Sequence, residues 1–327
     1  MNNLLITLGA IIPAEAFTFL SELPELRVLK CVDLTKNQPE ATNQAIDAIC
    51  IEMNTMVDMN FLDKYPNCRY LLTATTGVSN INEELLIERK IELISLRNEV
   101  SFLAGITSTS EFALGLTLSV WRKIALATKA VTLDMTRNDL SSLQIKGKKV
   151  GIVGMGRIGK RLVKYFDALE CEVFYYDTEV IDESQVQGAN SVESITTLCE
   201  KANILVICAS YNQNFLKSYP IIKKEHIAIM PKDSIIINVA RGGLLDESAA
   251  LDALEAKHLY GLGLDVLADE DLHNSTQNIR RRAEVLFDKG FNLVITPHIG
   301  GMSKDAYFEC YRFIASKFAS KLDSDCL

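Results

Sequence analysis

The sequence predicts an α/β protein built from two doubly wound parallel sheets, and three observations predict it. The chain has 327 residues, which exceeds what one hydrophobic core usually organises. Short β-rich runs alternate with helical patterns along the whole chain, which is typical of parallel strands joined by crossover helices. Several of these runs are continuous Val/Ile segments, as expected for strands covered by helices on both faces.

In the first part of the chain we expect five strands, at residues 3–8, 27–32, 48–51, 70–73 and 91–95. A long helix is then expected to start near Ser108, three residues before Glu111 in a capping-box pattern, and to run through residues 112–131. Its mostly apolar face, which includes Trp121, predicts burial between domains or subunits and marks a boundary.

From residue 148 the pattern is sharper, with a strand at 148–154, a helix at 157–169 and a strand at 172–177. Four more strands are expected at 204–209, 234–239, 261–265 and 293–296. The segment Gly154-Met155-Gly156-Arg157-Ile158-Gly159 fits the pattern GxGxxG between the first of these strands and its helix, and Asp177 stands at the end of the next strand.

The chemistry of this motif explains its residues. Small residues let the backbone approach a pyrophosphate, whose charge is stabilised by free N–H groups and by the dipole at the helix start. Asp177 accepts hydrogen bonds from ribose hydroxyls and repels a ribose phosphate, which favours NAD over NADP. The sequence therefore predicts a dinucleotide-binding domain with NAD as its cofactor.

Composition favours a small-molecule partner. Apolar residues make up 48% of the chain and charged residues 23%, and no segment approaches the about 20 apolar residues of a membrane span. The net charge of -8, without a basic cluster, argues against nucleic acid or an anionic membrane. The eight cysteines form no CxxC pair, so no metal site or disulfide framework is indicated and a cytoplasmic location is expected.

Three polar residues follow apolar strands, where ligands of open parallel sheets bind: Arg241, Glu270 and His298. Singly, each has an ordinary structural interpretation, as a cap, a solvated loop charge or a satisfied strand end. Together they form a catalytic set. Arginine offers a fixed fork of donors to a carboxylate or keto oxygen, and histidine exchanges a proton near neutral pH when a carboxylate orients it.

Four motifs now carry a family resemblance. The motif GMGRIG, with NVARGGLLDE (238–247), GLGLDVLADED (261–271) and TPHIGG (296–301), resembles the D-isomer-specific 2-hydroxyacid dehydrogenases, from about residue 48 onward. The resemblance implies that Arg241 binds and polarises the 2-keto acid group, that His298 is the general acid/base, and that Glu270 holds His298. Because Asp271 stands where the family usually has proline, Asp269 is an alternative to Glu270.

The resemblance also implies binding residues. Substrate carboxylate would bind the backbone N–H groups of Thr76, Gly77 and Val78. Cofactor contacts would involve Gly154, Gly156, Arg157, Ile158, Gly159, Asp177, Val239, Ala240, Asp265, Gly300 and Gly301.

The implied architecture is discontinuous. Residues 1–100 and 301–327 would form a flavodoxin-like substrate domain, and residues 101–300 a Rossmann cofactor domain. A helix at 303–321 would pack back on the first domain, and the cleft between the domains would be the active site. A homodimer through the cofactor domain, using the apolar helix after Ser108, is also implied.

The expected function is hydride transfer between a nicotinamide and C2 of a D-2-hydroxy acid or 2-keto acid, with 3-phosphoglycerate, hydroxypyruvate and glyoxylate as candidate substrates. Arg69 and Arg97 are candidate ligands for a substrate phosphate. The alternative is a non-enzymatic NAD-sensing binding protein of the corepressor type on the same fold.

Overall fold

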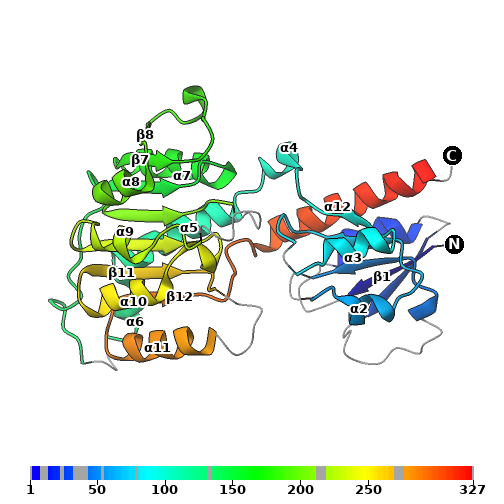
Figure 1. Cartoon of the computed structure of the whole chain (residues 1–327), viewed down its shortest axis with the longest axis horizontal. Helices are drawn as coiled ribbons and strands as arrows, with labels where there is room; N and C mark the ends of the chain where they lie inside the picture. Colours follow the sequence, from blue (N-terminus) through cyan, green and yellow to red (C-terminus); the bar gives the residue numbers. More distant parts are fainter. Residues whose placement is uncertain are drawn as a thin grey trace. The chain divides into compact units, whose positions relative to one another are not determined.

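The structure is a computed structural model that describes residues 2–7, 14–22, 26–31, 43–52, 55–78, 80–130, 134–210, 219–268 and 276–325. The chain divides into two compact units (Figure 1). Unit 1 comprises Met1–Ile106 and Met302–Leu327, and unit 2 comprises Thr107–Gly301. The sequence expectation places these boundaries at residues 100 and 300.

Unit 1 contains a five-stranded parallel sheet in the order β2-β1-β3-β4-β5. The strands are β1 Asn2–Thr7, β2 Leu26–Cys31, β3 Ala48–Ile51, β4 Tyr70–Thr73 and β5 Glu92–Ile94. The helical elements are η1 Ala14–Glu22, α2 Met59–Asp63, α3 Glu83–Glu88, α4 Val100–Leu103 and α12 Lys304–Asp325. All five strands lie where the alternation of apolar runs predicts them, within one or two residues.

The helix α12 joins unit 1 from the far end of the chain. Its side chains Tyr311, Ile314 and Phe318 are fully buried in a core that includes Phe17 of η1 and Leu72 of β4. The hydroxyl of Tyr311 also donates a hydrogen bond to the carbonyl of Ile51 at 3.3 Å. Burying three large side chains of this kind contributes about 1.5–3 kcal/mol each, which is ample to hold the helix on the sheet.

Unit 2 contains a seven-stranded parallel sheet in the order β12-β11-β10-β9-β6-β7-β8. Its strands are β6 Lys149–Val153, β7 Glu172–Tyr176, β8 Ala189–Ser191, β9 Ile204–Ile207, β10 Ser234–Asn238, β11 Leu259–Leu264 and β12 Leu293–Ile295. The strand order reverses between β6 and β9, and ligands of such sheets bind at this reversal. Two parallel α/β sheets confirm the predicted fold class.

The helices of unit 2 lie on both faces of its sheet, as Figure 1 shows. They are α5 Ser108–Trp121, α6 Ile124–Thr128, α7 Arg157–Ala168, α8 Ile195–Lys201, α9 Lys224–Ala228, α10 Glu247–Glu255 and α11 Thr276–Asp288, with short 3-10 turns η2 Glu183–Gln185 and η4 Gly242–Leu244. The strand β8 is absent from the sequence prediction because it has three residues, of which Asn190 and Ser191 are polar and exposed at the edge of the sheet.

The prediction of one long helix after Ser108 is wrong. The helix α5 ends at Trp121, Lys123 takes the left-handed conformation (φ 54°), and α6 begins at Ile124. The break lets the Lys123 ammonium donate to the carbonyl of Asp139 at 3.0 Å and lie 5.0 Å from the ring centre of Tyr260.

The predicted capping box is wrong as well. The N-cap of α5 is Thr107, whose side chain makes no capping hydrogen bond, and the Ser110 hydroxyl donates to the carbonyl of Thr107 at 2.6 Å.

The buried apolar side chains of α5 pack within unit 2. A Cβ on Gly263 of β11 would lie 2.9 Å from Leu116, so the glycine lets helix and sheet approach closely.

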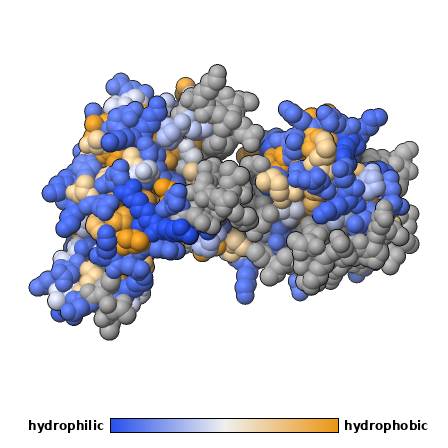
Figure 2. Space-filling model, turned by 60° about the horizontal axis from the view of Figure 1, so that its bottom comes forward, coloured by the Kyte–Doolittle hydropathy of each residue, from blue (hydrophilic) through white to orange (hydrophobic). Residues whose placement is uncertain are grey.

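The face in Figure 2 is mainly hydrophilic, with scattered hydrophobic patches in both units. None of the helices in the described ranges combines the length and apolar character that a bilayer crossing requires.

Candidate active site

The glycine motif lies between β6 and α7, at the reversal of strand order. Gly154 has φ 93°, and a Cβ there would lie 2.4 Å from the Cα of Ala209, just after β9. A Cβ on Gly159 would lie 2.3 Å from the carbonyl oxygen of Gly154. These two glycines are therefore required by the chain's own packing.

Gly156 differs from them. It is exposed, its φ is -75°, and a Cβ there would meet no atom of the chain within 4 Å. It is the N-cap of the 12-residue helix α7, and no side chain caps this end. The first N–H groups of a helix need acceptors, and this end, with Arg157 and Ile158 as its first residues, fits a pyrophosphate.

Asp177 directly follows β7 and lies beside the glycine motif. Its Oδ2 accepts a hydrogen bond from the N–H of Met155 at 2.5 Å, and its Oδ1 accepts from the N–H of Glu179 at 3.0 Å. The structure thus brings Asp177 and the motif together, as the sequence expects. It adds a role that the pattern did not indicate, because this carboxylate also holds the loop.

Arg241 follows β10 and begins the short turn η4. Asn238, the last residue of β10, is fully buried and fixes this turn. Its side-chain amide donates to the carbonyl of Arg241 at 2.9 Å, and its side-chain oxygen accepts from the N–H of Ala240 at 3.1 Å. The Arg241 guanidinium donates to the carbonyl of Ala240 at 2.7 Å. Val239, the other residue of the turn, is also buried.

His298 follows β12 and has the left-handed backbone conformation (φ 56°), which is uncommon for a side chain with a Cβ. Its N–H donates to the carbonyl of Asp265 at 2.8 Å and to that of Thr296 at 3.0 Å. These bonds stabilise a sharp turn directly beyond the strand. The imidazole is half-buried.

Asp265, directly after β11, organises this turn. Its side chain is 1% exposed. Its Oδ1 accepts from the Thr296 hydroxyl at 2.6 Å and from the N–H of Ile299 at 2.9 Å, and its Oδ2 accepts from the N–H of Gly300 at 2.8 Å. The sequence predicts that Asp265 contacts the cofactor. The structure shows in addition that its carboxylate holds the turn that carries His298.

The two glycines of the turn differ in their surroundings. A Cβ on Gly300 would lie 2.7 Å from Oδ2 of Asp265, so a side chain there would displace the carboxylate. Gly301 is exposed, and its nearest contact would be 3.8 Å from Thr109. The position of the Asp265 carboxylate therefore requires glycine at residue 300.

The strands β10, β11 and β12 are neighbours in the sheet, so Arg241, Asp265 and His298 follow three adjacent strand ends. The N–H of Asp265 donates to the carbonyl of Asn238 at 2.9 Å, which ties the first two ends together. The third expected catalytic residue, Glu270, and its alternative Asp269 lie outside the described residues.

In unit 1, the segment Thr76–Val78 follows β4. The Val78 side chain is buried in a hydrophobic cluster and anchors the segment, and the Thr75 hydroxyl donates to the carbonyl of Gly77 at 2.8 Å. Within the described ranges, no acceptor is found for the N–H groups of Thr76, Gly77 and Val78. Such a row of backbone donors suits a carboxylate.

The two candidate phosphate ligands are placed unfavourably. Arg69 precedes β4 and Thr76 follows it, so the two lie at opposite ends of a strand about 10 Å long. Arg69 also pairs with Asp47 at 3.6 Å. Arg97 is engaged by both carboxylate oxygens of Glu83, at 2.7 and 3.0 Å.

Five cysteines in the described part of the chain are buried, Cys50, Cys68, Cys199, Cys208 and Cys310, and Cys171 is partly buried. Burial raises the pKa of Cys208 to about 12, and its thiol donates to the carbonyl of Gly154 at 3.1 Å. Burial likewise raises the pKa of Cys199 to about 12. In the part of the chain that the structure describes, no group of His, Cys, Asp or Glu side chains could hold a metal ion.

Residues 114–300 match the NAD binding domain of the D-isomer specific 2-hydroxyacid dehydrogenases, which confirms the prediction of NAD as cofactor. An aromatic 2-oxoacid reductase of Clostridium sporogenes is 31% identical over 268 residues, which cover 80% of this chain and 78% of that protein. A D-3-phosphoglycerate dehydrogenase of Methanocaldococcus jannaschii is 28% identical over 294 residues, which cover 89% of this chain and 52% of that protein.

The chain spans about half the length of the curated phosphoglycerate dehydrogenases that it matches. Among solved structures, a D-lactate dehydrogenase from Aquifex aeolicus, complexed with NAD and lactic acid, superposes with a TM-score of 0.79 at 20% identity, covering 99% of this chain and 96% of that one. Its likeness shows the shared fold. From the match over residues 114–300, the chain belongs to the D-isomer specific 2-hydroxyacid dehydrogenase family.

Proposed function

We propose that this chain is an NAD-dependent oxidoreductase that interconverts a D-2-hydroxy acid and the corresponding 2-oxo acid. The observation that carries the proposal is the alignment of Arg241, Asp265 and His298 at three adjacent strand ends of a sheet that belongs to an NAD-binding family. An arginine and a histidine fixed on rigid strand ends suit the recognition of a carboxylate and the transfer of a proton.

Each of the proposed catalytic residues has its own role. In the reducing direction, protonated His298 gives its proton to the C2 oxygen, and the Arg241 guanidinium binds the substrate carboxylate and polarises the keto group. Glu270 is proposed to orient the imidazole. Oxidation reverses each step, so His298 takes the hydroxyl proton. When bound, NADH would supply the hydride to C2 in reduction, and NAD+ would accept it in oxidation.

The cofactor would be held by the first turn of α7 and by the strand ends. The N–H groups of Arg157 and Ile158 suit the pyrophosphate, because no side chain caps this helix. Asp177 retains acceptor capacity for ribose hydroxyls beyond its bonds to Met155 and Glu179. The backbone of Val239 and Ala240, Asp265 and the Gly300–Gly301 turn complete the proposed set.

The substrate would bind its carboxylate at the N–H groups of Thr76–Val78. The engagement of Arg69 and Arg97 with acidic partners favours an unphosphorylated 2-oxo acid over 3-phosphoglycerate. Hydroxypyruvate and glyoxylate are therefore the first substrates to test, and the aromatic 2-oxoacid reductase among the relatives adds aromatic 2-oxo acids to that set.

The test follows the absorbance of NADH during incubation with these 2-oxo acids. We expect oxidation of NADH with at least one acid, and a loss of at least about 100-fold in kcat for His298→Gln. His226→Gln is the matched control, because His226 lies on α9 and its Nδ1 accepts the backbone N–H of Lys223 at 3.1 Å. Tight NADH binding without turnover of any 2-oxo acid would favour the corepressor-like alternative.

A homodimer through unit 2 is part of the same proposal. With a chain mass of 36.4 kDa, light scattering should give 72.8 kDa (2 × 36.4). A mass of one chain at working concentration would contradict it.

A further inference from the structure

Glu247 is a buried carboxylate that the proposed reaction does not use. It is the first residue of α10 and is only 5% exposed. Within the described ranges, Glu247 and Asp265 are the acidic side chains classed as buried. Burial of a carboxylate is costly unless it is hydrogen-bonded, so the groups that it binds bear on its role. Its Oε1 accepts a hydrogen bond from the N–H of Ala268 at 2.7 Å.

The same stretch of chain packs against the Arg241 turn. A Cβ on Gly242, the residue after Arg241, would lie 1.8 Å from both the N atom of Ala268 and the carbonyl carbon of Leu267. No side chain fits there, so the two backbones are in direct contact. The Glu247 carboxylate therefore fastens residues 267–268 to the turn that carries Arg241.

The exit of β11 is thus held on both sides. Asp265 at its start binds the His298 turn beyond β12. Glu247 binds its end, Ala268, to the turn beyond β10. In the sequence, Glu270 follows Ala268 by two residues.

We infer that Glu247 is a positioning residue of the proposed active site: its carboxylate fixes Ala268, and through it the point from which the chain leads to Glu270, relative to Arg241. The inference rests on the proposed function. It gives Glu247 a role in positioning other groups, while the proposed reaction steps assign it none.

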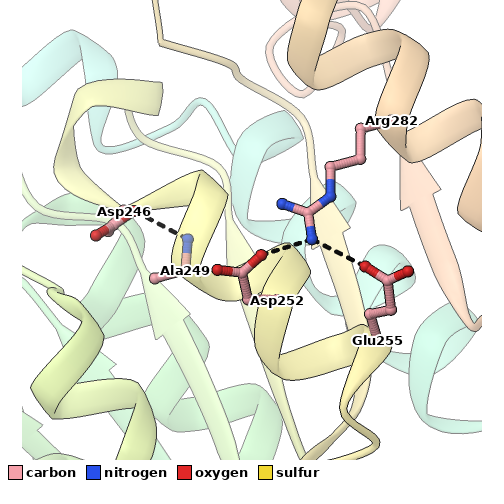
Figure 3. A network of polar contacts seen from close by, with 5 residues as sticks. All are labelled: Asp246, Ala249, Asp252, Glu255 and Arg282. Atoms are coloured by element: carbon pink, nitrogen blue, oxygen red, sulfur yellow. Dashed lines mark hydrogen bonds and ion pairs between the residues drawn. The ribbon is translucent and has the colours of Figure 1, made fainter.

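Stabilisation of α10 does not account for the arrangement. Asp246 already caps this helix, since its carboxylate accepts from the N–H of Ala249 at 3.0 Å (Figure 3). An acidic residue in the first turn interacts favourably with the helix dipole, and this interaction does not require the residue to be buried. Burial against Ala268 is the feature that requires another explanation.

Two conservative substitutions of Glu247 distinguish the effect of its side-chain length from the effect of its charge. Glu247→Gln keeps an acceptor oxygen at the same distance and loses the charge. Glu247→Asp keeps the charge at the helix start and withdraws the oxygen by one methylene. We expect Glu247→Asp to lower kcat/KM about 10- to 100-fold, as for a misplaced site, and Glu247→Gln to stay within about threefold of wild type.

Glu255→Gln is the matched control. Glu255 lies at the other end of α10, largely exposed, where it pairs with Arg282 of α11 at 3.0 Å (Figure 3). We expect it to leave kcat/KM unchanged. An unchanged kcat/KM in Glu247→Asp, or an equal loss in Glu247→Gln, would overturn the inference.

A double variant tests whether Glu247 acts through Glu270. If it does, Glu247→Asp adds little to the loss in Glu270→Gln, so the double variant should lie within about threefold of Glu270→Gln alone. A loss equal to the product of the two single losses would contradict the assigned role.

Hydrogen exchange gives a readout that needs no substrate. The amide of Ala268 should exchange at least tenfold faster in Glu247→Asp than in wild type or in Glu247→Gln. Unchanged exchange would refute the positioning contact itself. If the wild-type chain turns over no 2-oxo acid while this exchange pattern holds, the proposed function fails and the contact stands.

Discussion

The substitution Asp265→Asn changes one atom at the centre of the His298 turn. The Asp265 carboxylate accepts three hydrogen bonds, two of them from backbone N–H groups of Ile299 and Gly300. The amide of asparagine has one acceptor oxygen and one donor nitrogen. Whichever way the amide is oriented, its NH₂ group faces a backbone N–H, and that donor is left without an acceptor.

The magnitude follows from the contacts. A hydrogen bond to a charged acceptor contributes about 1.5–3 kcal/mol, and a buried donor left unsatisfied costs about 1–3 kcal/mol. Since Asp265 is 1% exposed, water cannot replace the lost acceptor. We therefore expect about 2–4 kcal/mol of destabilisation. For a unit of 150–250 residues this lowers Tm by roughly 5–15 °C.

Differential scanning calorimetry measures the shift, with Asp246→Asn as the control. Asp246 accepts one backbone N–H at the start of α10, and asparagine is an equally good N-cap, so Tm should change little. The same chemical change at two sites thus isolates the geometry of the Asp265 turn. If both variants have the same Tm as the wild type, the Asp265 carboxylate does not stabilise the turn as inferred.

Three further predictions concern glycines and thiols. Gly300→Ala should lower Tm, because its Cβ would lie 2.7 Å from Asp265; calorimetry checks this. Gly156→Ala should leave Tm unchanged, since its Cβ meets no atom of the chain, yet weaken NADH binding at least about tenfold in a fluorescence titration; equal affinity would contradict the assigned pyrophosphate site. Burial raises the pKa of Cys68, Cys199 and Cys208 from 9.0 to about 12, so the folded state keeps these thiols neutral while the unfolded chain ionises. Their stabilisation is complete below pH 9 and falls above it, by roughly 4 kcal/mol at pH 10 for three thiols; urea midpoints at pH 8 and 10 should show a smaller fall in Cys199→Ala.

The sequence predicts the fold well because most of the signal is local. Buried strands such as Ile235–Ile237 are continuous apolar runs, and their positions follow from hydropathy alone. The helix break at Lys123 is a different case. The residues around it favour helix, and the break is stabilised by tertiary contacts with Asp139 and Tyr260, which no local pattern contains.

The residues of the candidate site fall into two groups, those that a local sequence pattern indicates and those whose role depends on tertiary contacts. The sequence indicates Arg241 and His298 because ligands of parallel sheets bind at the carboxyl ends of strands, a rule that needs no tertiary detail. It does not indicate the supporting residues Asn238 and Glu247. Their roles depend on β10 and β11 being neighbours, and on Gly242 touching residues 267–268, which the order of residues in the chain does not specify.

The three glycines of the GxGxxG motif have different roles in the structure, although the sequence pattern treats them alike. In the pattern GxGxxG, Gly154 and Gly159 are fixed by atoms of the chain itself, so they would be needed for folding whether or not a cofactor binds. Only Gly156 has open space where its side chain would be. Gly156 and the uncapped start of α7 are therefore the features of this loop that point to a ligand, and a substitution of Gly156 separates binding from folding.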